Sequence, residues 1–176
     1  MNKILFSLCT VMLFALGSIQ AQGNRAPSPS AKLVQKVGLT DVTIEYSRPG
    51  MKDRTIFAAD GLVPFGKKWR TGANSATKIT FSDAVTFGDT ELAAGSYAIL
   101  TTPNAKSWDV HFFPYEATRW GGYASATPTL TVSADAQMMS NSIESFLITI
   151  DHLRDYSAHL VMMWDKTMVA VPFKVK

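Results

Sequence analysis

The chain has 176 residues, of which 17 are lysine or arginine and 14 are aspartate or glutamate, so its formal net charge is +3. The cations are scattered and no run is longer than the pair Lys67-Lys68, which argues against a nucleic-acid-binding protein. A chain of this length can bury the core of one stable domain, and the absence of a repeat of about 20–50 residues argues against propellers and solenoids.

The N-terminus has the pattern of a secretory signal peptide. Lys3 supplies a positive charge, residues 4–16 are almost wholly apolar, and Ala21 is a small residue at a plausible cleavage point. The apolar run is shorter than the roughly 20 residues that cross a bilayer as a helix. We therefore expect residues 1–21 to be removed on export, which places the protein in the periplasm or outside the cell. A retained N-terminal anchor is the alternative.

Removal of this segment would also remove Cys9, the one cysteine of the chain. The mature chain would then form no disulfide and have no thiol chemistry. No later apolar run is long enough to span a membrane. Residues 22–31 contain two prolines and a glycine and are expected to be a disordered tether. A single domain over residues 32–176 would follow.

Short strands dominate this domain. Strict alternation of apolar and polar residues predicts strands over residues 41–46 and 77–82. Further strands, most of them followed by turn-forming residues, are expected over residues 85–87, 96–102, 108–113, 129–133, 146–150, 158–164 and 168–175. The last two are separated by residues 165–167, which predicts a hairpin. Two short helical turns are expected near residues 60–67 and 137–142. The predicted fold class is all-β, an antiparallel β-sandwich or jelly roll.

The longest stretch without an obvious strand is about residues 47–76. Loops of this length are usually functional or disordered. This one contains apolar side chains such as Ile56, Phe57 and Trp69, which are unfavourable in water. We therefore expect it to fold over one end or edge of the sandwich as a packed lid.

Three arginines in this loop, Arg48, Arg54 and Arg70, are candidates for binding a ligand. Guanidinium groups bind carboxylate, phosphate or sulfate in a fork, and they stack on aromatic rings. The alternative, and the more common situation, is that they pair with acidic residues and fix the loop to the sheet. The acidic residues available for this are Glu45, Asp53, Asp60 and Asp83.

Two tryptophans and an asparagine complete the candidate site. Trp69 and Trp120 could offer an apolar face to a sugar ring, and Asn74 could exchange hydrogen bonds with its hydroxyls. Residues of these types more often have a structural role. Both indoles could plug the ends of the sandwich, and Asn74 could hold a left-handed turn.

The usual signatures of catalysis and metal binding do not occur in the sequence. It contains no His-Glu-x-x-His motif, no Gly-x-Ser-x-Gly motif and no glycine-rich phosphate loop. The three histidines, His111, His152 and His159, do not have the spacing of a common metal site. We therefore expect no catalytic residue, no bound metal and no cofactor.

The motifs of the long loop belong to an ordered series that continues to the end of the chain. The series comprises Tyr46-Ser47-Arg48-Pro49, Leu62-Val63-Pro64-Phe65-Gly66, Trp69-Arg70-Thr71-Gly72-Ala73-Asn74, Leu92-x-Ala94-Gly95-x-Tyr97 and Ala158-x-Leu160-x-Met162-x-Trp164. It resembles the signature of domain of unknown function (DUF) family 2911, from about Val37 onward. The resemblance implies an exported bacterial β-rich protein, and it carries no activity and no catalytic residue with it.

Three functions fit these observations. The first is an exported, non-catalytic binding module that holds a small polar or anionic ligand, such as a glycan or sugar acid, with the candidate side chains above. The second is an envelope hydrolase for glycans or peptides, which needs a nucleophile or paired carboxylates beside the arginines. The third is a structural or interaction protein of the envelope, which needs an exposed apolar patch, for example Leu160, Met162 and Trp164.

Overall fold

A computed structural model describes residues 26–176, so the signal-peptide interpretation of residues 1–21 lies outside the described residues. The described part is almost entirely β-structure. Its elements are β1 (Ser30–Val37), β2 (Thr40–Ser47), β3 (Phe57–Ala58), β4 (Val63–Pro64), β5 (Thr77–Phe81), β6 (Val85–Phe87), β7 (Thr90–Leu92), β8 (Gly95–Pro103), β9 (Ser107–Pro114), α2 (Gly121–Ser125), β10 (Leu130–Arg154) and β11 (Ser157–Lys174).

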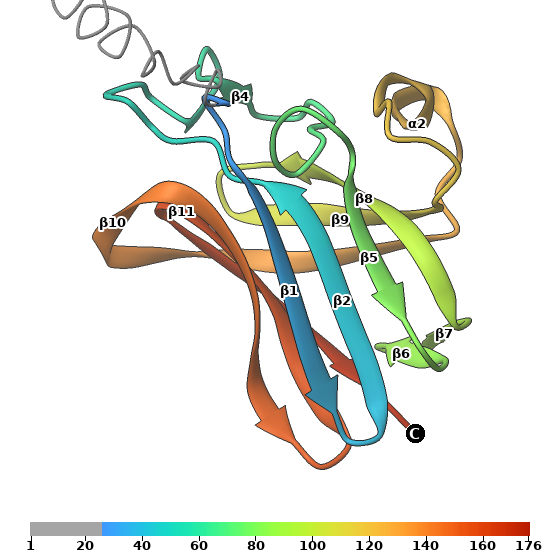
Figure 1. Cartoon of the computed structure of the whole chain (residues 1–176). Coiled ribbons are helices and arrows are strands. Elements are labelled where there is room, and N and C mark those ends of the chain that lie inside the picture. Colours follow the sequence, from blue (N-terminus) through green and yellow to red (C-terminus); the bar gives the residue numbers. More distant parts are fainter. Residues whose placement is uncertain (1–25) are drawn as a thin grey trace, which may run out of the picture.

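Nine strands form one antiparallel sheet in the order β1-β2-β5-β8-β9-β10-β11-β6-β7. Strand β10 joins the two halves of this sheet, since its residues 130–135 pair with β9 and its residues 136–154 pair with β11. Figure 1 shows β10 bending from one layer into the other. Within the described chain β1 and β7 each pair with one strand only, so the sheet does not close into a barrel. The all-β, sandwich-like fold predicted from the sequence is confirmed.

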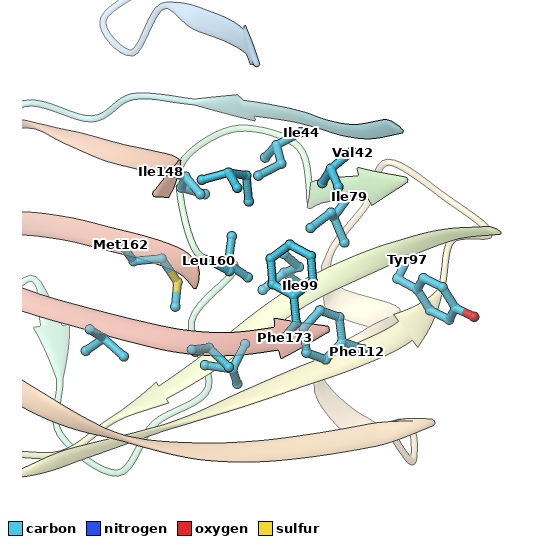
Figure 2. Close-up of a cluster of buried hydrophobic side chains, with 14 of the residues drawn as sticks. Val42, Ile44, Ile79, Tyr97, Ile99, Phe112, Ile148, Leu160, Met162 and Phe173 are labelled. Carbon is cyan, nitrogen blue, oxygen red and sulfur yellow. The ribbon is translucent and has the colours of Figure 1, made fainter. Parts of the chain in front are cut away.

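The core lies between the two layers. Alternation along β2 directs Val42 and Ile44 inward, and Ile79 on β5 does the same. These side chains face the same interior as Ile148 of β10 and Leu160 of β11, and all five are at most 2% exposed (Figure 2). Full burial of one such side chain contributes roughly 1.5–3 kcal/mol, so this core stabilises the domain without disulfides.

Two predictions about the C-terminal half are wrong. The expected hairpin at residues 165–167 is part of the continuous strand β11, and the chain reverses at residues 155–156 instead. Asp165 has a positive φ of 49°. The register of the β10–β11 pair is irregular opposite this residue, between Met138 and Leu147 of β10. The predicted helical turn at residues 137–142 lies within β10, because β11 supplies a pairing partner there.

Other boundaries also differ from the sequence-based expectation. Strand β1 begins at Ser30, so the expected tether over residues 22–31 is wrong at its end. The polar composition of this segment does not prevent strand pairing at residues 30–31, since the whole of β1 pairs with β2. Residues 60–67 form no helix. Val63 and Pro64 instead pair in parallel with Phe57 and Ala58. The short helix α2 is not among the elements that the sequence predicts.

Candidate functional site

The segment between β2 and β5 packs over one end of the sandwich, as the sequence predicts. In Figure 1 this end is opposite the β1–β2 and β10–β11 turns. The backbone of Trp69 forms two hydrogen bonds with Thr101 on β8, with N–O distances of 2.7 and 2.9 Å. Ile56 and Val63 are 1% and 3% exposed, so they attach the segment to the core. The segment is therefore ordered, and it can position side chains for a site.

Trp69 is the centre of an aromatic cluster beneath this segment. Its ring stacks on that of Trp164, with centroids 5.7 Å apart and an interplanar angle of 18°. Phe146 contacts it edge-on at 4.9 Å. Its indole Nε1 donates a hydrogen bond of 3.1 Å to the carbonyl of Gly72. A structural role therefore accounts for most of the contacts of Trp69.

A tight turn follows Trp69 and fixes the position of Arg70. Thr71 and Gly72 have φ values of 54° and 152°, which turn the chain sharply. A side chain at Gly72 would place a Cβ 2.9 Å from the carbonyl oxygen of Ser47, so only glycine fits. The hydroxyl of Thr77 donates a hydrogen bond of 2.6 Å to the Thr71 carbonyl. This buried turn holds the backbone of Arg70 against the sheet.

A cavity of about 340 Å³ lies beside this turn. We call it the cationic pocket and define it by Arg54, Lys67, Lys68, Arg70 and Trp120. Trp69 and Trp164 also line it, so part of its wall is aromatic. The pocket thus combines cations with apolar rings.

Arg70 is the least satisfied cation of the pocket. Its guanidinium carbon lies 5.4 Å from the centroid of the Trp120 ring, in a cation–π contact. Its Nε is buried and donates no hydrogen bond within the described part of the chain. A buried donor without a partner is unfavourable by about 1–3 kcal/mol. Because this Nε is covered by protein atoms, a ligand reaches Arg70 through the exposed part of its side chain.

The charge of the pocket is not neutralised by the protein. Its lining contains four cationic side chains and no carboxylate among residues 26–176. None of the ion pairs in the described structure involves an arginine. The alternative in which the arginines pair with acidic residues is therefore not observed in this part of the chain. Glu45, one of the proposed partners, lies near Lys32 and Lys78 instead.

Two other cations of the pocket are partly engaged. Lys68 donates a hydrogen bond of 3.0 Å from Nζ to the carbonyl of Ala124 next to the pocket. Arg54 donates from Nε and Nη2 to the carbonyls of Met51 and Gly50, at 2.9 and 2.7 Å. Of these three cations, Arg70 is the one with a buried nitrogen that has no partner in the described chain.

Of the six predicted ligand-binding residues, four line the cationic pocket: Arg54, Trp69, Arg70 and Trp120. Arg48 and Asn74 do not. The Nε of Arg48 donates a hydrogen bond of 2.9 Å to the carbonyl of Phe146. Asn74 has a φ of 59° and donates to the Ser28 carbonyl and the Ser47 hydroxyl, both at 3.2 Å. The contacts of these two residues indicate structural roles.

Lys67 and Lys68 are pocket residues that sequence reasoning does not select. The sequence feature that could have selected these two lysines is their position directly before Trp69-Arg70 in the same loop. In the sequence, this pair is notable only as the longest run of cations. The sequence does not show that both lysines line the same cavity as Trp120, which is about 50 residues away along the chain.

The described lining of the pocket is cationic. Its lining includes no carboxylate, imidazole or thiol among the described residues, and Lys67 and Lys68 are the side chains there that could exchange a proton. His152 and His159 stack on each other, with centroids 4.6 Å apart, and line no part of this pocket. Residues 26–176 contain no group of three or more His, Cys, Asp and Glu side chains that could hold a metal ion.

Comparison with known families agrees with the resemblance noted above. A family model described as "Protein of unknown function (DUF2911)" matches residues 28–173, and the chain belongs to this family. No curated protein and no solved structure matches the chain. A search of residues 26–176 finds no helix with the length and apolar character needed to span a membrane.

Proposed function

We propose that this DUF2911 protein is an exported, non-catalytic binding module that holds a small anionic ligand, a sugar acid or an acidic glycan unit, in the cationic pocket. The observation that carries the proposal is the environment of the Arg70 side chain. Its guanidinium lines a cavity with three other cations and no carboxylate, and its buried Nε has no partner in the described chain. The export part of the proposal rests on the signal-peptide pattern of residues 1–21.

The pocket suits a ligand that is both anionic and ring-shaped. A carboxylate can accept two parallel hydrogen bonds from one guanidinium, which makes Arg70 the expected anchor. The partly exposed face of Trp120 offers an apolar surface to the C–H face of a sugar ring. The cavity is close to the lower end of the range of about 300–1,000 Å³ that is typical of small-molecule sites. We therefore expect it to hold a single sugar unit.

The two other candidate functions have less support from this site. A hydrolase needs a nucleophile with a base, and Ser28 is the one hydroxyl residue in the described lining, without a carboxylate or imidazole beside it. An interaction surface at Leu160, Met162 and Trp164 is contradicted, since all three are 0% exposed.

Calorimetric titration with glucuronate, glucose and sulfate tests the proposal. We expect glucuronate to bind saturably and glucose to bind at least about tenfold more weakly, because hydrogen bonds to charged groups contribute about 1.5–3 kcal/mol. Sulfate should compete with glucuronate, since both present an anion to Arg70. The proposal would be contradicted if neither glucuronate nor sulfate bound saturably.

The variant Arg70→Gln tests whether Arg70 is the side chain that binds the carboxylate of the ligand. This variant should lose at least about tenfold in glucuronate affinity while its unfolding transition stays close to that of the wild type, since Arg70 makes no ion pair and its Nε no hydrogen bond in the described structure. Arg154→Gln is the matched control, because it removes the same charge from an exposed position at the end of β10. The β10–β11 turn that follows it lies at the opposite end of the sandwich (Figure 1). Equal affinities of the two variants would show that the pocket is not the binding site.

A further inference from the structure

A second concave site lies next to the cationic pocket and has different chemistry. It is a groove of about 590 Å³ formed by residues of β1, β2 and β5 and by the loop after β9. We call it the hydroxyl groove and define it by Ser30, Glu45, Ser75, Lys78, Tyr115 and Thr118.

The hydroxyl groove presents many hydrogen-bonding groups and little net charge. Ser30, Ser75 and Thr118 are exposed, so their hydroxyls are accessible to a ligand. The Glu45 carboxylate is 3.6 Å from the Lys78 ammonium and 3.8 Å from that of Lys32 at the edge of the groove. Lys32 also lines the groove, so two ammonium groups face one carboxylate and the charges sum to +1. The described lining of the cationic pocket has four cations and no carboxylate.

An aromatic ring completes the groove. Tyr115 is partly exposed, and the ammonium of Lys78 lies 5.2 Å from its ring centroid. Burial is the main cause of a raised pKa at the Tyr115 phenol, so the hydroxyl stays protonated and can donate a hydrogen bond. An aromatic face with surrounding hydroxyl, carboxylate and ammonium groups is suited to neutral sugar units, which present C–H faces and many hydroxyls.

The two sites share their borders. Ser28 lines the cationic pocket, and Ser30, two residues later, lines the hydroxyl groove. On a second segment, Ala73 lines the cationic pocket and Ser75, two residues later, lines the hydroxyl groove. Two residues of extended chain span roughly 7 Å, so the sites are immediate neighbours. A third segment gives Trp120 to the pocket and Thr118 to the groove.

Asn74 connects these borders. Its amide donates hydrogen bonds to the carbonyl of Ser28 beside the pocket and to the hydroxyl of Ser47, which also lines the groove. The backbone of Ala76 then donates to the carbonyl of Thr118, at 2.7 Å. These bonds fix the three bordering segments relative to one another. Asn74 is thus a positioning residue of the shared rim.

We propose that the cationic pocket and the hydroxyl groove form one extended site for an acidic oligosaccharide. The acidic unit occupies the pocket, where it meets Arg70, and neighbouring neutral units occupy the groove, where they meet Tyr115 and the hydroxyls. This inference rests on the proposed function, because it takes the pocket as the site of the acidic unit.

The test compares a monosaccharide with an oligosaccharide that contains it. The probes are glucuronate and a xylotriose that carries one glucuronate unit. We expect the oligosaccharide to bind at least about tenfold more tightly, because its neutral units add contacts to a ligand already held at one end. Tyr115→Ala should remove most of this gain and leave the affinity for glucuronate unchanged.

Two further variants keep the test decisive. Ser75→Trp fills the groove from an exposed position and should abolish the gain even if Tyr115→Ala folds poorly. Tyr156→Ala is the matched control, since Tyr156 is 69% exposed at the opposite end of the sandwich (Figure 1). It should bind both probes as the wild type does.

The outcomes separate this inference from the proposed function. If glucuronate binds but the oligosaccharide gains nothing, the extended site is wrong and the proposed function stands. If the oligosaccharide binds equally well to Arg70→Gln, the assignment of the acidic unit to the pocket is wrong. If neither probe binds the wild-type protein, both proposals fail.

Discussion

Two arginines of one loop illustrate how contacts decide the role of a residue. Arg48 and Arg70 are both partly buried, and both come from motifs that the sequence marks as candidates. The Nε of Arg48 donates to the Phe146 carbonyl at 2.9 Å, whereas the Nε of Arg70 has no partner in the described structure. The first arginine joins the loop to β10, and the second lines the cationic pocket without such a bond from its Nε.

Arg48→Gln should therefore affect stability and leave binding unchanged. Loss of the hydrogen bond to Phe146 leaves a carbonyl unpaired, which should lower the free energy of unfolding by about 1–3 kcal/mol. Urea denaturation measures this loss, and calorimetry should show wild-type affinity for glucuronate. Wild-type stability combined with weakened binding would reverse the roles assigned to Arg48 and Arg70.

His111 should make the stability of the domain depend on pH. It is 9% exposed, and its ring nitrogens lie 2.9 Å from the hydroxyls of Thr102 and Thr131. Burial, together with the charge of Lys68, lowers the pKa of His111 below its ordinary value of 6.5, while Asp109 opposes this effect. The folded state thus favours the neutral ring, and below pH 6.5 the unfolded state binds more protons.

The unfolding free energy should accordingly fall as the pH decreases through and below 6.5. His111→Gln removes the titrating group, so this variant should lose less stability than the wild type between about pH 7.5 and about pH 5. Denaturation curves at several pH values measure the difference. Parallel pH profiles for the two proteins would show that His111 does not contribute.

At the scale of elements, the segment between β2 and β5 depends on Trp69. This residue combines two backbone hydrogen bonds to Thr101 with ring contacts to Trp164 and Phe146. Trp120, in contrast, lies at the start of α2 and packs at the edge of a smaller cluster that includes Tyr123. The two tryptophans of the site therefore differ in what they support.

Trp69→Ala should destabilise the domain by about 3–5 kcal/mol, as is typical when a large aromatic side chain is removed from a core. Hydrogen exchange should also become faster across residues 56–72, because the segment loses its attachment. Trp120→Ala serves as the comparison and should reduce glucuronate affinity with a smaller loss of stability. A larger loss of stability at Trp120 than at Trp69 would contradict this division.

Sequence patterns predict the elements better than their connections. Alternation correctly predicts strands such as residues 41–46 and 77–82, since it follows directly from one buried face. The predicted hairpin at residues 165–167 is wrong because a short polar interruption between two apolar runs is compatible with either a turn or a bulge, and Asp165 lies at an irregularity within β11. Only the pairing of β10 with β11 distinguishes the two, and that pairing joins residues distant in sequence.

The same limit applies to the candidate site. The rigid, cation-rich and aromatic composition of the loop is sufficient to select Arg54, Trp69 and Arg70 for the pocket. It is not sufficient to exclude Arg48, whose partner Phe146 is 98 residues away along the chain. Local composition indicates which residues can bind a ligand, while long-range pairing determines which of them are left without a partner.

At the scale of the whole molecule, the distribution of charge is more informative than its total. The formal net charge of +3 is small for 176 residues and by itself indicates no ligand. The fold nevertheless places four cations around one cavity without a carboxylate in its described lining, at the end of the sandwich where the long loop and α2 lie (Figure 1). The architecture thus gives a nearly neutral chain a locally cationic cavity.

A crystal structure of the protein with glucuronate tests the central claim most directly. We expect the carboxylate to lie within hydrogen-bond distance of the Arg70 guanidinium and the sugar ring to lie in the cationic pocket next to Trp120. A glucuronate molecule bound elsewhere, with Arg70 still unpartnered in the pocket, would contradict it.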